Sequence, residues 1–588
     1  MLAWGQMEHT FEDSSDRQAA RSPEARAHLL QESDGVKESS STRRALSALA
    51  ILGFALPMAA YFWLIHHYGV NTPYADEWYN VDLIRQGLSF SALWAQHAEH
   101  RVFVPNLIVL LLARTTHFNI LVEEFLSGVL LCVAIVLLIL TDKRSSPSTP
   151  WIYYCPVALV SLSFVQVAST LFAFQLSWYL AILAFAVALF LLDRTDLTKL
   201  VLAGAMAAAV VGSLSAFEGL FIWPIGLVVL YHRRCPRGLV LAWIAAAAVT
   251  GAAYFHNYSF EGNSYWITHP TMAIRFFFLA IGDVVGAQLP DPHAGNVAVL
   301  VLGVVIFAVA CWVIVTRGLR RGKPTDSSVG VALIGFGLLF VATFTAGRVN
   351  GGLYVAGASQ YTTFDLMIVT GCYLALLNPS RSQLKAARRS ERLAWPILRM
   401  VMAGVIFLTI VFGTINGLNL ASELHQYQMT LADITANINK APDSLVEMEV
   451  PRGYPPWIRT EAQFAETDHL SLFATAAAAT YRKEGLPPPF SVLRTKMLVP
   501  ANGAQLSGIV VVLAVTADDV PVTKVTFHLA GGSQADELIG TATASLAGWG
   551  LRWNTTSLAN GTYTLRSEAY IASGKHSYSP AITITVRN

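Results

Sequence analysis

The run ALSALAILGFALPMAAYFWLI, residues 45–65, decides the fold class of this chain. It contains no charged residue, and it is long enough to cross the hydrocarbon core of a bilayer as a helix. Arg43 and Arg44 come directly before it. Because basic residues gather on the cytoplasmic side of membrane proteins, we expect residues 1–44 to lie inside the cell and the loop after Ile65 to lie outside.

The composition extends this prediction to most of the chain. Hydrophobic residues make up 54% of the 588 positions and charged residues only 13%, whereas soluble domains carry about 25% charged residues. Ten further apolar runs complete a predicted multi-pass α-helical membrane protein with 11 transmembrane helices, its N-terminus inside and its C-terminus outside. These runs lie near residues 119–140, 151–171, 174–192, 199–215, 217–231, 238–255, 297–315, 329–346, 362–377 and 395–415.

The basic residues of the loops support this orientation. The loops assigned inward hold 17 Lys and Arg, against five in the loops assigned outward before the last span. Two more apolar runs, 102–113 and 276–287, are ambiguous. Making both into spans would put seven basic residues outside, so we interpret them as re-entrant or interfacial segments of the outer face. Residues 84–94 have the pattern of a short interfacial helix.

Three polar parts flank the transmembrane domain, which we place at residues 45–420. Residues 1–44 are rich in Ser, Glu and Arg without apolar periodicity, so we expect a disordered cytoplasmic tail. Residues 421–499 mix polar and helical stretches and are interpreted as an extracytoplasmic linker region. Residues 500–588 form the C-terminal domain.

Alternating apolar and polar residues indicate that the C-terminal domain is a β-sandwich. Four such runs, IVVVLAV, VTKVTFHL, TYTLRSEAY and AITITV, are separated by Asn, Gly, Asp and Ser clusters. The stretch WNTTSLANGTYTL, residues 553–565, resembles bacterial immunoglobulin-like modules, which carry a W-x-T-T-x-L-x-N-G-x-Y pattern. The resemblance implies an immunoglobulin-like fold, but that fold alone does not give a ligand.

The first outer loop, residues 68–118, concentrates ionisable groups between apolar helices. Near its start it contains NTPYADEWYN, residues 71–80, and further along it contains EHR, residues 99–101. Clustered ionisable groups in a long loop of an apolar protein are candidates for a functional site. The candidates in this loop are Asp76, Glu77, Glu99, His100 and Arg101.

This arrangement resembles the membrane glycosyltransferases of the GT-C fold, through the Asp76-Glu77 pair in the first outer loop of a chain with about 11 spans. The likeness covers residues 45–420. Glu99-His100-Arg101 and the stretch GR…ASQYTT, residues 347–363, are similar to features of uncharacterised bacterial relatives. In those relatives we expect Ser-Arg-Tyr where this chain has Ser359-Gln360-Tyr361.

The resemblance implies transfer of a sugar from a polyprenyl-phosphate carrier to a glycan or protein acceptor of the cell envelope, at the outer face of a bacterial plasma membrane. Asp76 would be the catalytic base, and Glu77 would orient it or share a divalent cation such as Mg²⁺ or Mn²⁺ with it. Guanidinium groups suit the leaving phosphate because they bind it bidentately. The implied donor-binding residues are Arg101, His100, Arg348, Gln360 and Tyr361, and the implied acceptor-binding residues are Glu99, Glu218 and Trp178.

Each candidate also has a simpler interpretation. The two acids can form a solvated turn after Pro73, and Arg101 can cap a helix or contact lipid headgroups. Glu218 is expected at a polar turn for solubility alone, and Trp178 fits the interfacial aromatic belt. His97 and His100 have i, i+3 spacing and could join Glu99 and Asp76 around a metal, or be structural. The five cysteines lack metal-site spacing, so we interpret them as inert thiols.

Two other functions stay open at this point. One is a transporter or flippase of lipid-linked sugars, which would place ionisable residues near the bilayer midplane. The other is a non-catalytic protein that displays an adhesive immunoglobulin-like domain. The sequence has no P-loop and no dinucleotide fingerprint, which fits a lipid-linked donor. It has no basic patch for nucleic acid, so the expected partners are the lipid-linked sugar, the acceptor and membrane lipids.

Overall fold

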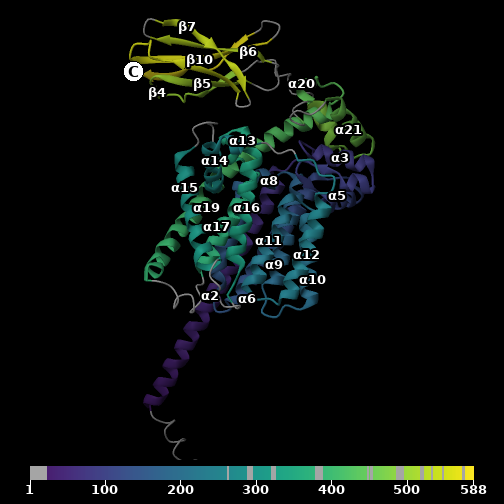
Figure 1. Cartoon of the computed structure of the whole chain (residues 1–588), viewed down its shortest axis with the longest axis vertical. Helices are drawn as coiled ribbons and strands as arrows, with labels where there is room; N and C mark the ends of the chain where they lie inside the picture. Colours follow the sequence, from purple (N-terminus) through teal and green to yellow (C-terminus); the bar gives the residue numbers. More distant parts are fainter. Residues whose placement is uncertain are drawn as a thin grey trace, which may run out of the picture.

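The computed structural model describes residues 23–260, 264–287, 296–318, 326–377, 389–446, 449, 455–484, 495–516, 522–531, 534–545, 548–571 and 576–588. Figure 1 shows a bundle of helices, an outer helical layer above it and a β domain at the C-terminal end. The first described element is helix α2 (Pro23–Tyr68). Residues 23–44 of the tail expected to be disordered belong to this helix, which continues into the apolar run. Residues 1–22 lie outside the described residues.

The remaining helices follow α2 in chain order. They are α3 (Glu77–Gln86), α4 (Phe90–Trp94), α5 (Phe103–Thr116), α6 (Ile120–Ser145), α7 (Cys155–Ser161), α8 (Val167–Thr170), α9 (Leu176–Leu192), α10 (Lys199–Ser213), α11 (Ile222–His232), α12 (Arg237–Tyr254), α13 (Tyr265–Thr268), α14 (Pro270–Gly282), α15 (Val297–Val313), α16 (Val329–Arg348), α17 (Thr362–Leu377), α19 (Arg389–Ala436), α20 (Asp443–Val446), α21 (Pro455–Thr467) and α22 (Ala477–Glu484).

All eleven apolar runs predicted as spans contain helix. By length and composition, eight segments of the described chain could cross a membrane: Ala45–Tyr68, Ile120–Ser145, Trp151–Thr170, Ala173–Leu192, Arg237–Tyr254, Val297–Gly318, Val329–Gly351 and Leu393–Ala436. The other three form shorter apolar helices, Lys199–Ser213, Phe217–His232 and Thr362–Leu377. The number of spans and their orientation therefore stay predictions.

Glycines allow close packing of helices in the bundle. A Cβ added to Gly330 on α16 would lie 2.8 Å from the Gly371 carbonyl oxygen on α17, and one added to Gly371 would lie 2.7 Å from the Gly330 carbonyl oxygen. Side chains larger than hydrogen would push these helices apart. Small residues at such contacts are typical of helices that pack in membranes.

The third predicted span is not one continuous helix. It contains α7, a 3₁₀ turn at Phe164–Gln166 and the short helix α8, and a further 3₁₀ turn at Ala173–Gln175 precedes α9. The expected interfacial helix at residues 84–94 is also divided, into the end of α3 and α4. Gly87 lies between them with a φ of +71°, which ends the first helix.

An outer layer joins the first loop to the segment expected to be a linker. The buried ring of Trp78 on α3 donates from Nε1 to Glu449 Oε2 at 3.3 Å. Arg85 on α3 pairs with Glu461 on α21 at 3.0 Å. One apolar cluster runs through α3, α5, the end of α19 and α21. The described residues between 421 and 484 therefore pack as the second half of this outer layer, as α20 and α21 beside α3 and α5 show in Figure 1.

The C-terminal domain is a sandwich of two sheets. One sheet has the order β4-β12-β10-β6-β7, with β11 beside β10, and the other has the order β3-β5-β9-β8. The strands are β3 (Thr495–Val499), β4 (Ala504–Leu506), β5 (Ile509–Thr516), β6 (Val522–Gly531), β7 (Gln534–Thr541), β8 (Thr543–Ser545), β9 (Gly548–Asn554), β10 (Gly561–Ile571), β11 (His576–Tyr578) and β12 (Ile582–Val586). The sandwich begins with β3, five residues before the predicted boundary at 500. The five cysteines are free.

Candidate functional site

Asp76 stands at the start of α3 with an available carboxylate. Its side chain is 46% exposed and does not cap its own helix. Its Oδ2 lies 3.6 Å from Nε2 of His97. The preceding residue, Ala75, has a left-handed φ of +50° and donates its N–H to the Glu449 carbonyl oxygen at 2.6 Å. Such strain in a non-glycine residue persists only where surrounding contacts impose it, and it is common at functional sites.

Glu77 is buried next to Asp76 and has a different environment. Its Oε1 accepts the Ala173 N–H at 2.7 Å, and its Oε2 accepts the Tyr74 N–H at 3.1 Å. Burial raises the pKa of Glu77 to about 8, although these backbone N–H groups favour the charged form. Glu77 therefore fastens the first loop to the turn before α9.

The short hairpin of β1 (Gln96–His97) and β2 (His100–Arg101) positions the two histidines. Its strands pair antiparallel, and Ala98 in the turn has a φ of +47°. The amide of Gln96 exchanges hydrogen bonds with Ser259, which fixes the hairpin to the end of α12. The His97 ring packs between Tyr79 and Phe174, with centroids 4.7 and 4.8 Å away.

His100 lies buried between two carboxylates. Its Nδ1 accepts the Phe217 N–H at 3.1 Å, so a neutral ring carries its proton on Nε2. That Nε2 lies 3.9 Å from Glu99 Oε1, while Glu218 Oε2 lies 3.7 Å from Nδ1. Burial lowers the pKa of His100 to about 4, against the opposing effect of Glu99. The ring is therefore neutral near pH 7 and can donate a hydrogen bond from Nε2.

Arg348 brings a cation to the same cluster from the end of α16. Its Nη2 donates to both carboxylate oxygens of Glu99, at 2.8 and 3.2 Å, and its side chain is 44% exposed. Tyr361 lies beside this guanidinium and packs on Phe344 with centroids 4.1 Å apart. Trp178 lies 5.7 Å from the Tyr361 ring and 6.5 Å from the His100 ring, so it connects the two halves of the cluster.

Arg101 is used within the fold. Its guanidinium donates to the carbonyl oxygens of Trp94, Tyr254, His256 and Asn257 at 2.6 to 3.2 Å. The residue is only 4% exposed. A guanidinium has five N–H donors, and four carbonyls take most of them. This geometry favours a structural role for Arg101 over the predicted contact with phosphate.

The loop before α17 is tied to the broken third span. Ser359 Oγ donates to the Val165 carbonyl oxygen at 2.5 Å, and Ser169 Oγ donates to the Gln360 carbonyl oxygen at 2.5 Å. These contacts hold Tyr361 at the cluster. Gln360 contributes its backbone to them, and its side chain interacts with Tyr361.

Sequence reasoning missed a pair of acids in the first turns of α6. Glu123 and Glu124 are buried, and none of their four carboxyl oxygens has a hydrogen-bond partner among the described residues. A Cβ on Gly69 would lie 2.8 Å from Glu124 Oε2. Two adjacent acids in an otherwise apolar run are a visible signal, because charged side chains inside apolar segments are costly and usually functional.

The cluster brings together Asp76, His97, Glu99, His100, Glu218, Arg348, Tyr361 and Trp178, which come from parts of the chain up to 285 positions apart. His97 belongs to it, although it was considered only as a metal ligand or as a structural residue. Across the described residues, no three His, Cys, Asp or Glu side chains are grouped so that they could hold a metal ion. Both carboxyl oxygens of Glu77 also accept hydrogen bonds from backbone N–H groups. The residues present therefore do not fit the predicted divalent cation shared by Asp76 and Glu77.

Comparison with known proteins identifies one part of the chain. Residues 495–566 match the family model of the bacterial Ig domain, which confirms the predicted C-terminal module. No curated protein matches the chain. Two solved structures are similar over 24% of it: an endo-β-1,4-mannanase from Thermotoga petrophila, with 18% identity over 25% of that chain, and an engineered protein, with 22% identity over 29% of that chain. Both have a TM-score of 0.15, and this chain spans less than a third of the length of either structure.

Proposed function

We propose that the chain is a GT-C-type glycosyltransferase, which transfers a sugar from a polyprenyl-phosphate carrier to a cell-envelope glycan or protein outside a bacterial plasma membrane. The observation that carries this proposal is the Asp76 carboxylate, exposed at a strained helix start and 3.6 Å from His97. In the proposal all eleven apolar helices span the membrane, with the N-terminus inside. The first loop, Glu218 and Arg348 then share the outer face.

Asp76 acts as the base in the proposed reaction. The acceptor hydroxyl oxygen attacks the anomeric carbon and its proton passes to Asp76, while the bond from that carbon to the phosphate oxygen breaks. The phosphate leaves with the electron pair and needs no general acid. Proton transfer to a positioned carboxylate contributes about 10²–10⁴-fold to such rates.

Arg348 and His100 bind the phosphate group in this mechanism. Arg348 keeps one edge on Glu99 and is exposed enough to present its other N–H groups to an anion. The neutral His100 can donate from Nε2 beside it. Glu99 orients Arg348, and the rings of Trp178 and Tyr361 provide apolar faces for a sugar. Glu77 and Arg101 position the loop, and no step is assigned to a cation.

A transporter of lipid-linked sugars is the second candidate, favoured by buried acids and by the broken third span. Asp283 on the 3₁₀ turn after α14 and Asp365 on α17 are fully buried, and no partner of Asp283 Oδ1, Asp283 Oδ2 or Asp365 Oδ1 is found among the described residues. Intramembrane acids beside interrupted helices occur in ion-coupled transporters. A pure display protein is less favoured, because one span is enough to anchor a domain.

Detergent-solubilised protein separates these candidates, because transfer needs no sealed compartment whereas transport does. Purified protein would be incubated with radiolabelled polyprenyl-phosphate sugars and delipidated cell-envelope acceptor. We expect label to move into the acceptor fraction. Movement of labelled lipid across sealed proteoliposomes, without any label transfer in detergent, would overturn the glycosyltransferase proposal in favour of the transporter.

A further inference from the structure

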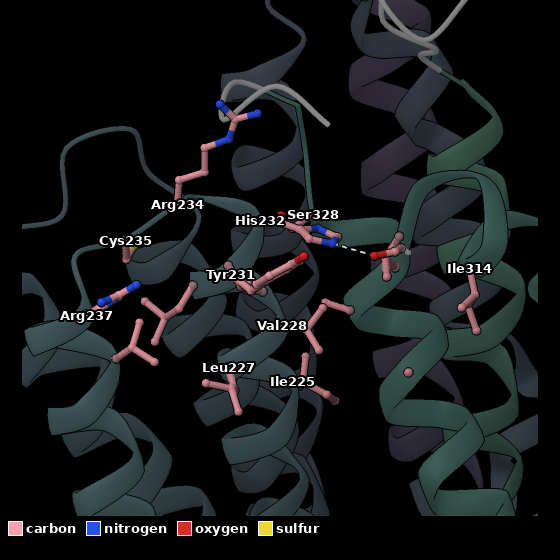
Figure 2. A pocket seen from close by; sticks show the side chains of 17 residues that line it. Ile225, Leu227, Val228, Tyr231, His232, Arg234, Cys235, Arg237, Ile314 and Ser328 are labelled. Carbon is pink, nitrogen blue, oxygen red and sulfur yellow. Dashed lines mark hydrogen bonds between the residues drawn. The ribbon is translucent and has the colours of Figure 1, made fainter. Parts of the chain in front are cut away.

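A groove opens at the end of the bundle opposite the Asp76 cluster. Its volume is about 940 Å³, and it lies between α11 and the start of α12 on one side and α16 and the π-helical turn Ile314–Gly318 on the other. Figure 2 shows Ile225, Val228 and Tyr231 of α11 projecting toward it, with Ile314 on the far wall. Val228 and Tyr231 are 43% and 49% exposed. Val228 and Tyr231 therefore lack the cover that a neighbouring helix would give, whereas Ile225 is buried at the base of the groove.

Three basic residues stand where the groove meets the end of α11. His232 closes its inner end, with Nε2 2.6 Å from the Gly318 carbonyl oxygen (Figure 2). Arg234 and Arg237 follow on the turn into α12, and both line the groove. Arg234 has a left-handed φ of +55°, so the chain reverses direction here.

The two groove arginines differ from the arginine beside them. Arg233 is buried and its Nε donates to Asp193 Oδ1 at 2.8 Å. Within the described ranges, the guanidinium groups of Arg234 and Arg237 have neither a hydrogen bond nor an ion pair. Arg233 is therefore held inside the fold by Asp193, whereas Arg234 and Arg237 present their positive charges at the opening of the apolar groove.

We propose that this groove binds an anionic phospholipid of the cytoplasmic leaflet, with its acyl chains against α11 and α16 and its phosphate on Arg234 and Arg237. The charge of the two arginines complements the phosphate, and the apolar walls complement the chains. Basic pockets between transmembrane helices on the cytoplasmic side bind anionic headgroups in this way. The proposal rests on the orientation proposed above, and it does not depend on sugar transfer.

This lipid site is separate from the outer cluster. Glu218 precedes α11 and Arg234 follows it, so the two sites lie at opposite ends of the same helix. A soluble anion would use the arginines but leave the apolar walls uncovered. A neutral lipid would cover the walls but leave the cations without a partner. An anionic lipid satisfies both.

The test uses the full chain purified in nanodiscs of phosphatidylcholine with a rising fraction of phosphatidylglycerol. Lipid that stays bound after transfer to detergent is identified and counted by native mass spectrometry. Wild-type protein should retain phosphatidylglycerol in preference to phosphatidylcholine. The double variant Arg234→Gln/Arg237→Gln should need about tenfold more phosphatidylglycerol for the same occupancy. Because neither guanidinium has a described partner, this variant should remain folded.

Two further variants separate the groove from general surface charge. Arg144→Gln/Arg194→Gln removes the same charge from the same end of the bundle, where both arginines stack on Phe190, and it should retain lipid as the wild type does. Val228→Trp keeps the arginines but fills the groove, and it should reduce retention.

Three results would overturn this proposal: equal losses in the control variant, retention of phosphatidylcholine as strong as that of phosphatidylglycerol, or no retained lipid in the wild type. Sugar transfer is not measured, so a negative result leaves the glycosyltransferase proposal untouched.

Discussion

Two arginines, Arg101 and Arg348, have different surroundings and therefore different expected roles. Arg101 donates to four backbone carbonyls that follow or precede it by up to 156 positions. Arg348 pairs with the exposed carboxylate of Glu99, and much of the Arg348 side chain remains exposed. Sequence position alone could not separate them, since both lie in polar segments that were predicted to be outside. The carbonyl partners of Arg101 are invisible in a sequence, because every residue has a carbonyl.

Replacing Arg101 should therefore affect folding more than chemistry. In Arg101→Gln the four carbonyls lose their charged donor, and we expect the free energy of unfolding to fall by at least about 2 kcal/mol. Thermal unfolding in detergent would measure this loss. Arg114→Gln is the matched control, because Arg114 is exposed in the last turn of α5. An unfolding temperature equal to that of the control would contradict the structural role.

Arg348→Lys should leave folding intact and lower transfer. Lysine keeps the positive charge but cannot make the planar, two-pronged contact with phosphate. We expect a decrease of about tenfold or more in the rate of label transfer, with normal membrane insertion. Full activity of Arg348→Lys would exclude bidentate phosphate binding at this position.

At the scale of elements, the outer layer depends on two buried acids. Glu77 fastens the loop before α3 to the turn before α9. Glu449 accepts hydrogen bonds from Trp78 on α3 and Thr435 on α19. Burial raises the pKa of each carboxyl to about 8. The neutral form of each acid is therefore the form that the folded layer favours.

The outer layer should loosen as the pH rises. The pKa of each carboxyl is higher in the folded state than in the unfolded state, so its contribution to stability is complete below the unfolded pKa of about 4.3. That contribution is lost as the pH rises through the folded pKa of about 8. Hydrogen exchange of α3 and α21 should therefore be faster at pH 9 than at pH 6, after correction for the intrinsic pH dependence of exchange. The helices α16 and α17 serve as the internal control. Protection of α3 and α21 that is equal at both pH values would contradict this account.

Helices and strands with a local sequence pattern could be predicted, whereas features that depend on long-range contacts could not. Apolar runs marked the helices of the bundle, and alternation marked the strands, because both patterns are local. The packing of residues 421–484 on the first loop could not be predicted, since it rests on long-range contacts such as Arg85 with Glu461. The predicted start of the C-terminal domain, residue 500, lies after β3. The short sequence of β3 takes its register from its pairing with β5, and a sequence does not show that pairing.

For the whole molecule, the sequence placed most of the candidate site before any contact was known. Asp76, Glu99 and His100 were chosen as ionisable residues of the long first loop, and Glu218, Arg348 and Tyr361 were implied by the resemblance to GT-C enzymes. The fold gathers all six. Glu123, Glu124 and Asp365 were missed, because the spans were treated as nearly free of charge. The immunoglobulin-like domain has its own apolar core, centred on Val512, Phe527 and Leu565.

The most direct test of sugar transfer at the outer face compares Asp76→Asn with Asp82→Asn in membranes supplied with radiolabelled polyprenyl-phosphate sugars. Asp82 lies on the same helix and pairs with Arg85, outside the cluster. Both variants should be made and inserted as the wild type is. We expect Asp76→Asn to lose transfer by about 10²–10⁴-fold and Asp82→Asn to retain it. Equal transfer by the wild type and Asp76→Asn would contradict the role of Asp76 as the catalytic base.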